Sequence, residues 1–543
     1  MKRLLFAVVA CSALWISACS SGSSSTPPPP PAGNFSLSSL TGTYAFTTSG
    51  EVFSNAGEAN LTRTGSFTAD GKGDINAGGV YDTVIAGGAS NQAIPITGGS
   101  YTVNADGRGT LTLNVNASGV ATSINFGFVL TSGSSGTSPA TSGLMIDETS
   151  NASQASTGSG NFVMQTAADF QISNISGTYV FDFSGLDASP APLSIVGEVT
   201  VSNGLTTGGF EDSNDNFALG SGPIGGGGSF IADPVNMATA GRGTVTIAGQ
   251  PFAFYIVDSN RVRLISSNAV SGPMLSGDAV FQDNTIPTNV SSINSSFAFL
   301  VAGSTANGGV TRLCRFTADG SSVTKVLLDT NNAGTQFIPT NGATNASISL
   351  DSANPGRGIL TFLEQGQSSN VPSSFVFYLN SASQGVIQQT TTNTATGAVI
   401  AVADGSIDAQ SGGPFSSSNI TGTYAMNWSG LVTAGGSFAN TDEEDQLAQV
   451  KVSSLSFSGT SDIFQFTSAT LTPKTDIATS GNITFNGGDG TGDDGNRVNM
   501  NVTLSGQNAI EMVVYIVSPQ LAFFADQNNS SGRVVAGVLE AQQ

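Results

Sequence analysis

Apolar and polar residues alternate with a period of two along most of the chain after residue 33. Tyr44 and Phe46 open one such stretch, and Phe126 and Phe128 mark another. This period places apolar side chains on one face of a β-strand, and turn residues such as Asp70-Gly71 separate the stretches. No segment after residue 19 keeps a 3.6-residue period. The pattern therefore predicts an all-β protein in which helices are scarce.

The same alternating phrase opens four stretches of the chain. Its aromatic anchors are Tyr44, Tyr179, Phe297 and Tyr424, which lie 135, 118 and 127 residues apart. Each interval has the length of one domain, and the order of strand-like segments repeats within it. We therefore predict four tandem β-modules of about eight antiparallel strands each. Their expected bounds are 34–165, 166–282, 283–410 and 411–543.

Sequential strands joined by short turns can close into an up-and-down barrel, which leaves no exposed sheet edge. An immunoglobulin-like sandwich usually needs Greek-key connections and often a core Trp beside a disulfide. Beyond residue 19 the chain has only Trp428 and a single cysteine, Cys314. The sequence therefore favours the up-and-down barrel, with the sandwich as the alternative, and it predicts that Cys314 is buried.

An apolar segment with fixed spacing precedes each opening strand. Phe35, Phe170 and Phe415 each lie nine residues before the opening tyrosine. This spacing predicts that the segment folds back as a lid on its own module. A lid before a Gly-x-aromatic strand resembles the lipocalin and avidin-type barrels. That resemblance implies an interior that side chains fill or that holds one small ligand.

The N-terminus has the layout of an export signal. Met1-Lys2-Arg3 is basic, and residues 4–15 are apolar but too few to span a bilayer. Ile16-Ser17-Ala18-Cys19 follows and resembles the bacterial lipobox. The resemblance implies that residues 1–19 are the signal and lipobox, that Cys19 is lipidated, and that the chain is attached to a membrane. Ser20 in place of Asp implies the outer membrane of the cell envelope.

Residues 20–33 are rich in Ser and Pro, which predicts a tether between the anchor and the first module. Together with the repeated modules, this layout resembles the tandem β-repeat envelope lipoproteins of environmental bacteria. That resemblance covers most of the chain but implies no particular activity.

Charge and composition narrow the chemistry. The formal net charge is −21 and the chain has no histidine. Such an acidic chain does not bind nucleic acid through a basic face. Without histidine, Ser-His-Asp and Cys-His catalysis and His-ligated metal sites are excluded. We therefore expect a protein that is not an enzyme and has no cofactor.

Few residues remain as candidate binding groups. Arg108, Arg242 and Arg357 each follow a glycine at one position of their modules. A row of guanidinium groups could grip carboxylates or sugars, whereas the structural alternative is an ion pair with a neighbouring Asp. Each module also closes on a glutamine, and these are Gln165, Gln282, Gln410 and Gln542.

Acidic side chains offer weak calcium candidates but no clear metal site. Calcium needs several oxygen ligands from a flexible loop. Two runs contain such groups, Asp489, Asp493 and Asp494 in one and Asp212 and Asp215 in the other. Neither run matches an EF-hand, so solvated loops are favoured, as for the run at 442–445. We expect the remaining Asp-Gly aspartates, Asp70, Asp106 and Asp319, to stabilise turns.

Two functions fit these observations. The first is a membrane-anchored envelope lipoprotein that serves as a structural spacer or as a multivalent binding or adhesion protein for a glycan or a protein. The alternative is a carrier of a small apolar ligand within lipocalin-like barrels. It predicts cavities lined by recurrent aromatic pairs, namely Phe126/Phe128, Phe252/Phe254 and Phe375/Phe377. If those pairs fill the cores instead, the carrier is disfavoured.

Overall fold

The structure is a computed structural model of the 543-residue chain. It describes residues 34–54, 57–87, 90–131, 138–151, 154–267, 272–338, 342–364, 371–393, 396–417, 419–433, 441–467, 470–485, 496–528 and 532–542. The signal, Cys19 and the tether lie outside the described residues. So do the calcium candidates Asp489, Asp493 and Asp494.

Four antiparallel sheets follow one another along the chain, and we call them modules 1 to 4. Module 1 contains β1 (Thr41–Ser54), β2 (Gly57–Asp70), β3 (Asp74–Ile85), β4 (Ser90–Tyr101), β5 (Arg108–Ala117), β6 (Val120–Leu130), β7 (Ser142–Asp147), β8 (Ser150–Asn151) and β9 (Gln154–Met164). Module 2 contains β10 (Gly177–Leu186), β11 (Pro192–Ser202), β12 (Leu205–Asp215), β13 (Ala218–Ile224), β14 (Ile231–Ala232), β15 (Arg242–Ile247), β16 (Gln250–Asp258), β17 (Arg261–Ser266) and β18 (Met274–Phe281).

The other two modules repeat this plan. Module 3 contains β19 (Asn294–Thr305), β20 (Gly308–Asp319), β21 (Val323–Asn332), β22 (Thr335–Phe337), β23 (Thr344–Leu350), β24 (Arg357–Glu364), β25 (Val371–Leu379), β26 (Gln384–Gln389) and β27 (Val402–Ala409). Module 4 contains β28 (Gly422–Thr433), β29 (Thr441–Ser453), β30 (Ser456–Thr467), β31 (Thr470–Phe485), β32 (Arg497–Leu504), β33 (Ile510–Ser518), β34 (Leu521–Asp526) and β35 (Arg533–Ala541).

Helical structure is confined to single turns in the described part of the chain. These turns are η1 (Leu37–Ser39), η2 (Ala167–Asp169), η3 (Ile172–Asn174), α1 (Met237–Ala240) and η4 (Val290–Ser292). None of them is long and apolar enough to cross a membrane.

Strand order confirms the all-β, up-and-down arrangement. Within each module, strands pair with their neighbours in sequence, apart from a small β7–β9–β8 rearrangement in module 1 and the unpaired β13/β14 and β22/β23. Module 1 closes through β1–β9, and module 4 is also a closed barrel. Modules 2 and 3 leave β13/β14 and β22/β23 as sheet edges, so barrel closure holds for two of the four modules. In module 2, residues 228–230 cross this gap and bond to Gly204 and Thr206.

The predicted lids are present in all three modules with a phenylalanine. Phe35, Phe170 and Phe415 are buried in the cores of modules 1, 2 and 4. A Cβ built on Gly107 would meet Phe35 at 2.9 Å, and one on Gly241 would meet Phe170 at the same distance. Both glycines have positive φ, +88° and +66°. Glycine at this position therefore permits both the turn and the close seat of the lid.

Contacting aromatic side chains fill the module interiors. Phe126 lies 5.7 Å from Phe46, and Phe252 lies 4.6 Å from Phe183, measured between ring centroids. The interiors also hold charge, with buried ion pairs Arg63–Asp147, Arg312–Glu364 and Arg533–Glu444 in modules 1, 3 and 4. The predicted burial of Cys314 is confirmed, because its thiol lies in the core of module 3. The aromatic pairs thus pack cores and leave little room for an apolar ligand.

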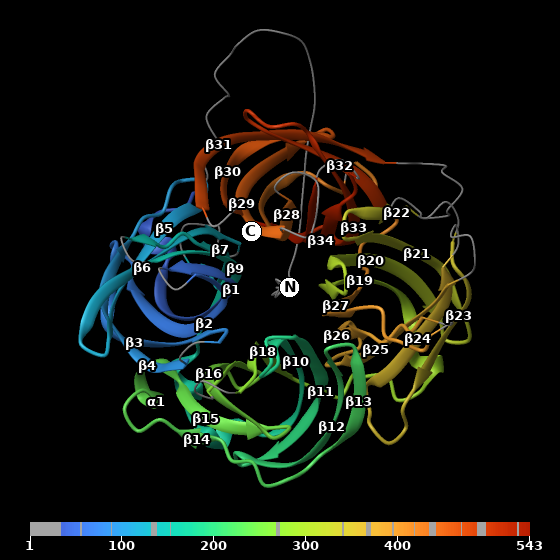
Figure 1. The fold of residues 1–543 in the computed structure, drawn as a ribbon, viewed down its shortest axis with the longest axis horizontal. Helices are drawn as coiled ribbons and strands as arrows, with labels where there is room; N and C mark the ends of the chain where they lie inside the picture. The colour runs from blue at the N-terminus through green and yellow to red at the C-terminus, as the bar shows by residue number, and fades with distance from the viewer. Residues whose placement is uncertain are drawn as a thin grey trace.

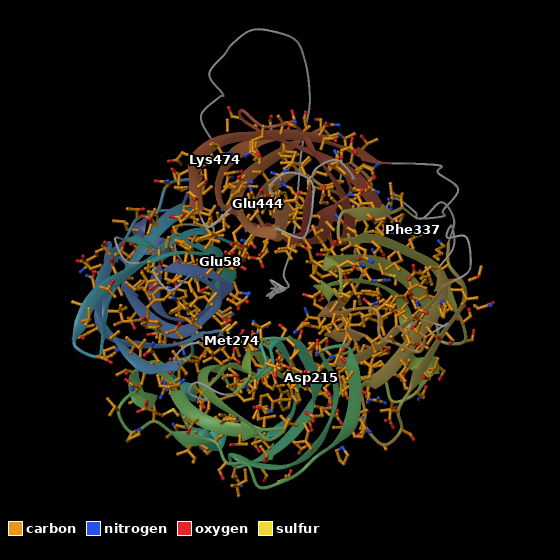
Figure 2. The ribbon with its side chains drawn as sticks, viewed as in Figure 1. Glu58, Asp215, Met274, Phe337, Glu444 and Lys474 are labelled. Carbon is orange, nitrogen blue, oxygen red and sulfur yellow. The ribbon has the colours of Figure 1, made fainter. Side chains whose placement is uncertain are left out.

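The four modules form a ring around a common axis, with module 4 returning to module 1 (Figure 1). The first and last strands of each module lie on the axial side (Figure 1). Their outward faces also pack: Val180 and Val196 meet Val376 and Tyr378 between modules 2 and 3. Figure 2 shows side chains filling both the barrels and the zones between them. The axial strands are therefore buried on both faces, which explains their nearly continuous apolar and small-residue sequence.

Candidate functional site

The acidic run at 443–445 and Asp212, which were expected in solvated loops, lie in buried strands, which corrects that prediction. Glu443, Glu444 and Asp445 belong to β29 and are at most 1% exposed. Asp212 belongs to β12 and is also buried. Glu444 pairs with Arg533 inside barrel 4, while Asp445 accepts a bond from Thr157 of module 1 at 2.6 Å. These carboxylates look solvated in sequence because their partners lie far away along the chain.

A repeated clamp joins successive modules. An aspartate from the third strand of one module accepts two bonds from an arginine of the next, and a tyrosine opposite that arginine donates a third. The three sets are Asp82 with Arg242 and Tyr255, Asp212 with Arg357 and Tyr378, and Asp329 with Arg497 and Tyr515. All nine bonds measure between 2.5 and 2.9 Å.

The clamp geometry is that of a strong, bidentate ion pair. Both carboxylate oxygens face the guanidinium fork, which adds directionality to the charge attraction. Burial and the facing carboxylate raise the pKa of Tyr255, Tyr378 and Tyr515, so each hydroxyl keeps its proton and donates it. The recurrent arginines therefore form ion pairs with aspartates, which was the structural alternative considered from the sequence. The aspartates, however, come from another module.

The seam between modules 4 and 1 closes the ring with a variant clamp. Arg108 Nη2 donates to Asp462 at 2.7 and 2.9 Å, and its Nη1 donates to Asp476 at 2.7 Å. Val129 stands opposite Arg108, where the other modules have tyrosine. The backbone N–H of Asp476 donates to Asp462 at 2.7 Å and thus takes the place of the tyrosine hydroxyl at this seam.

The closing glutamines provide a second repeated contact. Each donates its amide to backbone carbonyls of the next module, beside that module's clamp arginine or opposite it. Gln165 reaches Ala240 and Ile256, Gln282 reaches Pro355 and Leu379, Gln410 reaches Ile516, and Gln542 reaches Asp106 and Leu130. The last of these contacts runs from the C-terminal residues back to module 1. The same kind of glutamine contact therefore recurs at all four seams.

Replacing Gln542 with alanine is expected to destabilise the seam between modules 4 and 1. The change leaves the carbonyls of Asp106 and Leu130 without the amide that donates to both at 2.9 Å. Leaving a buried polar group unsatisfied costs about 1–3 kcal/mol. Thermal unfolding should report the loss, with Gln520→Ala at an exposed turn as the control. Equal melting of the two variants would contradict a role in ring closure.

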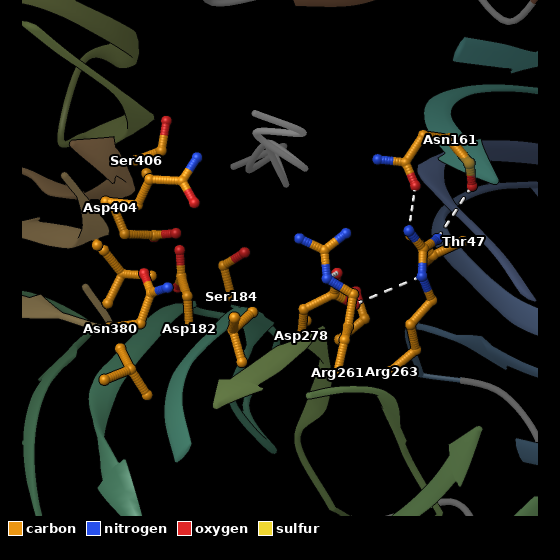
Figure 3. A pocket seen from close by; sticks show the side chains of 18 of the residues that line it. Thr47, Asn161, Asp182, Ser184, Arg261, Arg263, Asp278, Asn380, Asp404 and Ser406 are labelled. Carbon is orange, nitrogen blue, oxygen red and sulfur yellow. Dashed lines mark hydrogen bonds and ion pairs between the residues drawn. The ribbon is translucent and has the colours of Figure 1, made fainter. Parts of the chain in front are cut away.

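A polar cavity of about 170 Å³ lies on the axial side where modules 1, 2 and 3 meet (Figure 3). Asp182 and Asp404 lie on one side of it, and Arg261 and Arg263 lie on the other (Figure 3). Further cavities, lined in part by Glu198, Val84 and Asp329, also lie between modules. Of these four cavities, the axial one gathers the most charged groups, and it is our candidate binding site.

Alternation in two axial strands brings the acidic pair to this cavity. In β10, Tyr179, Phe181 and Phe183 point into the core, so Asp182 points outward across the seam. In β27, Ala403 and Ile407 point inward and Asp404 points toward module 2. Burial, followed by the Asp404 charge, raises the pKa of Asp182 well above its ordinary value. Burial also raises the pKa of Asp404 to about 6.

Arginines on the opposite side are held by their neighbours. Arg263 donates to the backbone oxygen of Asn161 at 3.0 Å, and its Nε lies 3.6 Å from Asp278. Arg261 lies 3.7 Å from the same Asp278. Asp408 completes the acidic side, and burial raises its pKa to about 7. The site thus combines an acid pair that shares one proton with a separate cluster of two guanidinium groups and one carboxylate.

The calcium candidates that the structure describes occupy different environments. Asp212 has both carboxylate oxygens bound to Arg357, while Asp215 lies at the exposed end of β12. In the described part of the chain, no group of three His, Cys, Asp or Glu side chains could hold a metal. The Asp-Gly aspartates act in turns as predicted: Asp70 accepts from Lys72 and Asp74, and Asp319 from Ser321 and Ser322.

The sequence missed the residues of the axial cavity. Asp182 and Asp404 each stand alone among apolar and small residues, and neither recurs at the equivalent position of other modules. The sequence showed that the closing glutamines recur, but it did not show what they contact. The cavity residues and the glutamine contacts were missed for the same reason, because their partners come from other modules.

Comparison with known proteins places this chain in no family. No protein-family model and no curated protein matches it. Among solved structures, intact Ap-TbpB with its N and C lobes is 11% identical, with a TM-score of 0.15 over 74% of this chain and 83% of that one. A mutant of transferrin binding protein B from Haemophilus parasuis Hp5 is 10% identical, with a TM-score of 0.18 over 74% and 82%.

A BenF-like porin from Pseudomonas fluorescens Pf-5 is 9% identical, with a TM-score of 0.11 over 92% of this chain and 96% of that one. At TM-scores this low, these likenesses carry no argument about function.

Proposed function

We propose that this chain is a lipid-anchored envelope protein whose four modules form one rigid, non-catalytic ring for binding a polar ligand, glycan or protein. The observation that carries the proposal is the closed ring, in which the same glutamine contact recurs at all four seams and an arginine clamp closes each. Such a ring holds loops and seam cavities in fixed positions, which reduces the entropy cost of binding.

The ring favours binding over a spacer. Modules strung in a row would extend away from the membrane, whereas a ring returns the end of module 4 to module 1 (Figure 1). Aromatic contacts and ion pairs in the module interiors argue against an apolar ligand held there. The composition also supports a role without catalysis, since a chain without histidine lacks the commonest general base.

Attachment through Cys19 is tested by replacing this residue with alanine. The wild-type chain is expected in the membrane fraction of a bacterial host, and the Cys19→Ala variant is expected to leave that fraction. The physical reason is that acyl chains add about 0.8 kcal/mol for each buried CH₂ group. Labelling with radioactive palmitate checks the modification itself, and Cys314→Ser serves as the matched cysteine control. Labelling retained in Cys19→Ala would contradict the anchor.

The binding role is tested with the soluble chain that begins after Cys19. Glycan arrays and pull-down from envelope extracts should recover a ligand that dissociates at high salt, because the proposed contacts are polar and charged. The proposal would be contradicted if neither experiment recovers a ligand and if deletion of the gene produces no surface phenotype.

A further inference from the structure

The axial cavity carries more acid than base. Its lining holds four carboxyl groups, from Asp182, Asp278, Asp404 and Asp408, and two guanidinium groups, from Arg261 and Arg263. Both arginines lie within 4 Å of Asp278, and Arg263 is also bound to Asn161. Among the described residues, no lysine or arginine forms an ion pair with Asp182, Asp404 or Asp408. The basic groups therefore lie with Asp278 and form no ion pair with the acidic side.

Strand register explains this separation of charge. Arg263, Asp278 and Asp182 lie opposite one another on β17, β18 and β10. Neighbouring strands lie about 4.8 Å apart, so Arg263 and Asp182 start from backbones roughly 10 Å apart. Asp404 lies farther still, on β27 of module 3. Arg263 turns toward Asn161 of module 1, away from the acid pair.

Asp182 and Asp404 form a side-chain hydrogen bond across the seam, and burial together with the Asp404 charge raises the pKa of Asp182. Asp404 is also hydrogen-bonded to Ser184 and Ser194. The Oδ1 atom of Asp182 is buried and has no hydrogen-bond partner among the described residues. Two carboxylates in contact cannot both ionise in a low-dielectric site, so the pair holds a shared proton. This proton is the smallest cation that can neutralise the site.

We propose that the axial cavity binds a small organic cation through a primary ammonium group, which takes the place of the proton shared by Asp182 and Asp404. An ammonium has three donors and no acceptor. The acid pair and the hydroxyl of Ser184 supply acceptors on one side of the cavity (Figure 3). A cavity of about 170 Å³ has the volume of roughly five or six waters at about 30 Å³ each, enough for an amino alcohol or one amino sugar.

This inference deepens the proposed binding role and rests on it. An amine-bearing ligand is polar, as that role requires, and one amino sugar unit is a fragment of a glycan. The remaining groups around the pair are the acids Asp278 and Asp408, the amides Asn380 and Gln384, and Arg261 and Arg263. Glu540 of β35 also lies near Arg261.

Proton exchange gives the inference a distinctive signature. An ammonium that enters the pair releases the shared proton, so the affinity for ethanolamine, which stays protonated over this range, should rise between pH 5.5 and pH 8. Isothermal titration with ethanolamine and with glucosamine, in phosphate and in MOPS, measures both affinity and the protons released. N-acetylglucosamine, which lacks the ammonium, and calcium chloride serve as comparison ligands. We expect amine binding with release of about one proton, and no binding of the neutral sugar.

Two isosteric variants test the residues. Asp404→Asn and Asp182→Asn each remove one carboxylate and keep the side-chain size, and each should weaken amine binding at least tenfold. Glu511→Gln makes the same change in net charge at an exposed position of module 4. Circular dichroism confirms that each variant is folded, and the second variant serves if the first does not fold.

Several outcomes would overturn the inference: unchanged amine affinity in both variants, equal binding of N-acetylglucosamine, or binding of calcium alone. The absence of any amine binding would do the same. None of these outcomes changes the result expected for the Cys19 fractionation or for the pull-down. The proposed function is therefore tested separately from this inference.

Discussion

Replacing Asp329 with asparagine is expected to lower the free energy of unfolding by about 3–5 kcal/mol, because it leaves a buried arginine without its counter-charge. Asp329 accepts two bonds from Arg497 and one from Tyr515, at 2.6–2.8 Å. Asparagine keeps the shape but donates toward the guanidinium with its amide. The loss should appear in urea unfolding as an earlier transition for modules 3 and 4.

The matched control for this prediction is Glu511→Gln, which makes the same charge change on an exposed side chain. The double variant Asp329→Leu with Arg497→Met removes both charges, and it should recover most of the lost stability because no charge is left buried alone. If Asp329→Asn unfolds at the same urea concentration as the wild type, the clamp is not a stabilising contact.

Stability is expected to be greatest near pH 5 and to fall as the pH rises to about 8. Burial raises the pKa of Glu540 and Glu148 to about 8, and that of Asp445 to about 7. These groups ionise in the unfolded chain near pH 4–4.5, so the folded state holds the extra protons between the two values. Their stabilising effect is complete below the unfolded pKa and is lost as the pH passes the folded pKa.

Each unit of pKa difference corresponds to about 1.4 kcal/mol, so each buried acid contributes on the order of a few kcal/mol to this slope. Thermal melts from pH 5 to pH 8.5 should therefore show a steady fall in melting temperature. Glu540→Gln cannot ionise and should flatten part of the slope, whereas Glu511→Gln should leave it unchanged. A melting temperature that rises from pH 5 to pH 8 would contradict these assignments.

Local pattern was sufficient for the fold of each module. Tyr44, Tyr179, Phe297 and Tyr424 are buried at the start of an opening strand, as their spacing predicted. The lids and the Asp-Gly turns were also predictable, since each depends on residues near in sequence. The open edges of modules 2 and 3 could not be predicted, because short edge strands such as β14 and β22 give little periodic signal.

The candidate site depended on contacts that no local pattern contains. Arg108, Arg242 and Arg357 were visible in sequence, but their partners Asp462, Asp82 and Asp212 lie 145 to 354 residues away along the chain. The run at 443–445 was predicted to be a polar loop because its consecutive acidic residues lie on both faces of β29, so no apolar alternation marks the strand there. A buried carboxylate is recognisable only when its partner is known.

Taken alone, the sequence determined the class of fold, the number of modules and the apolar faces of their strands, because periodicity of two and turn residues act over a few residues. The tertiary structure decided that the modules form a ring, that their arginines and glutamines join them, and that Asp182 meets Asp404. The physical reason is distance along the chain: ion pairs and shared protons form between groups brought together by packing, and packing of one module on another leaves no local mark in the sequence.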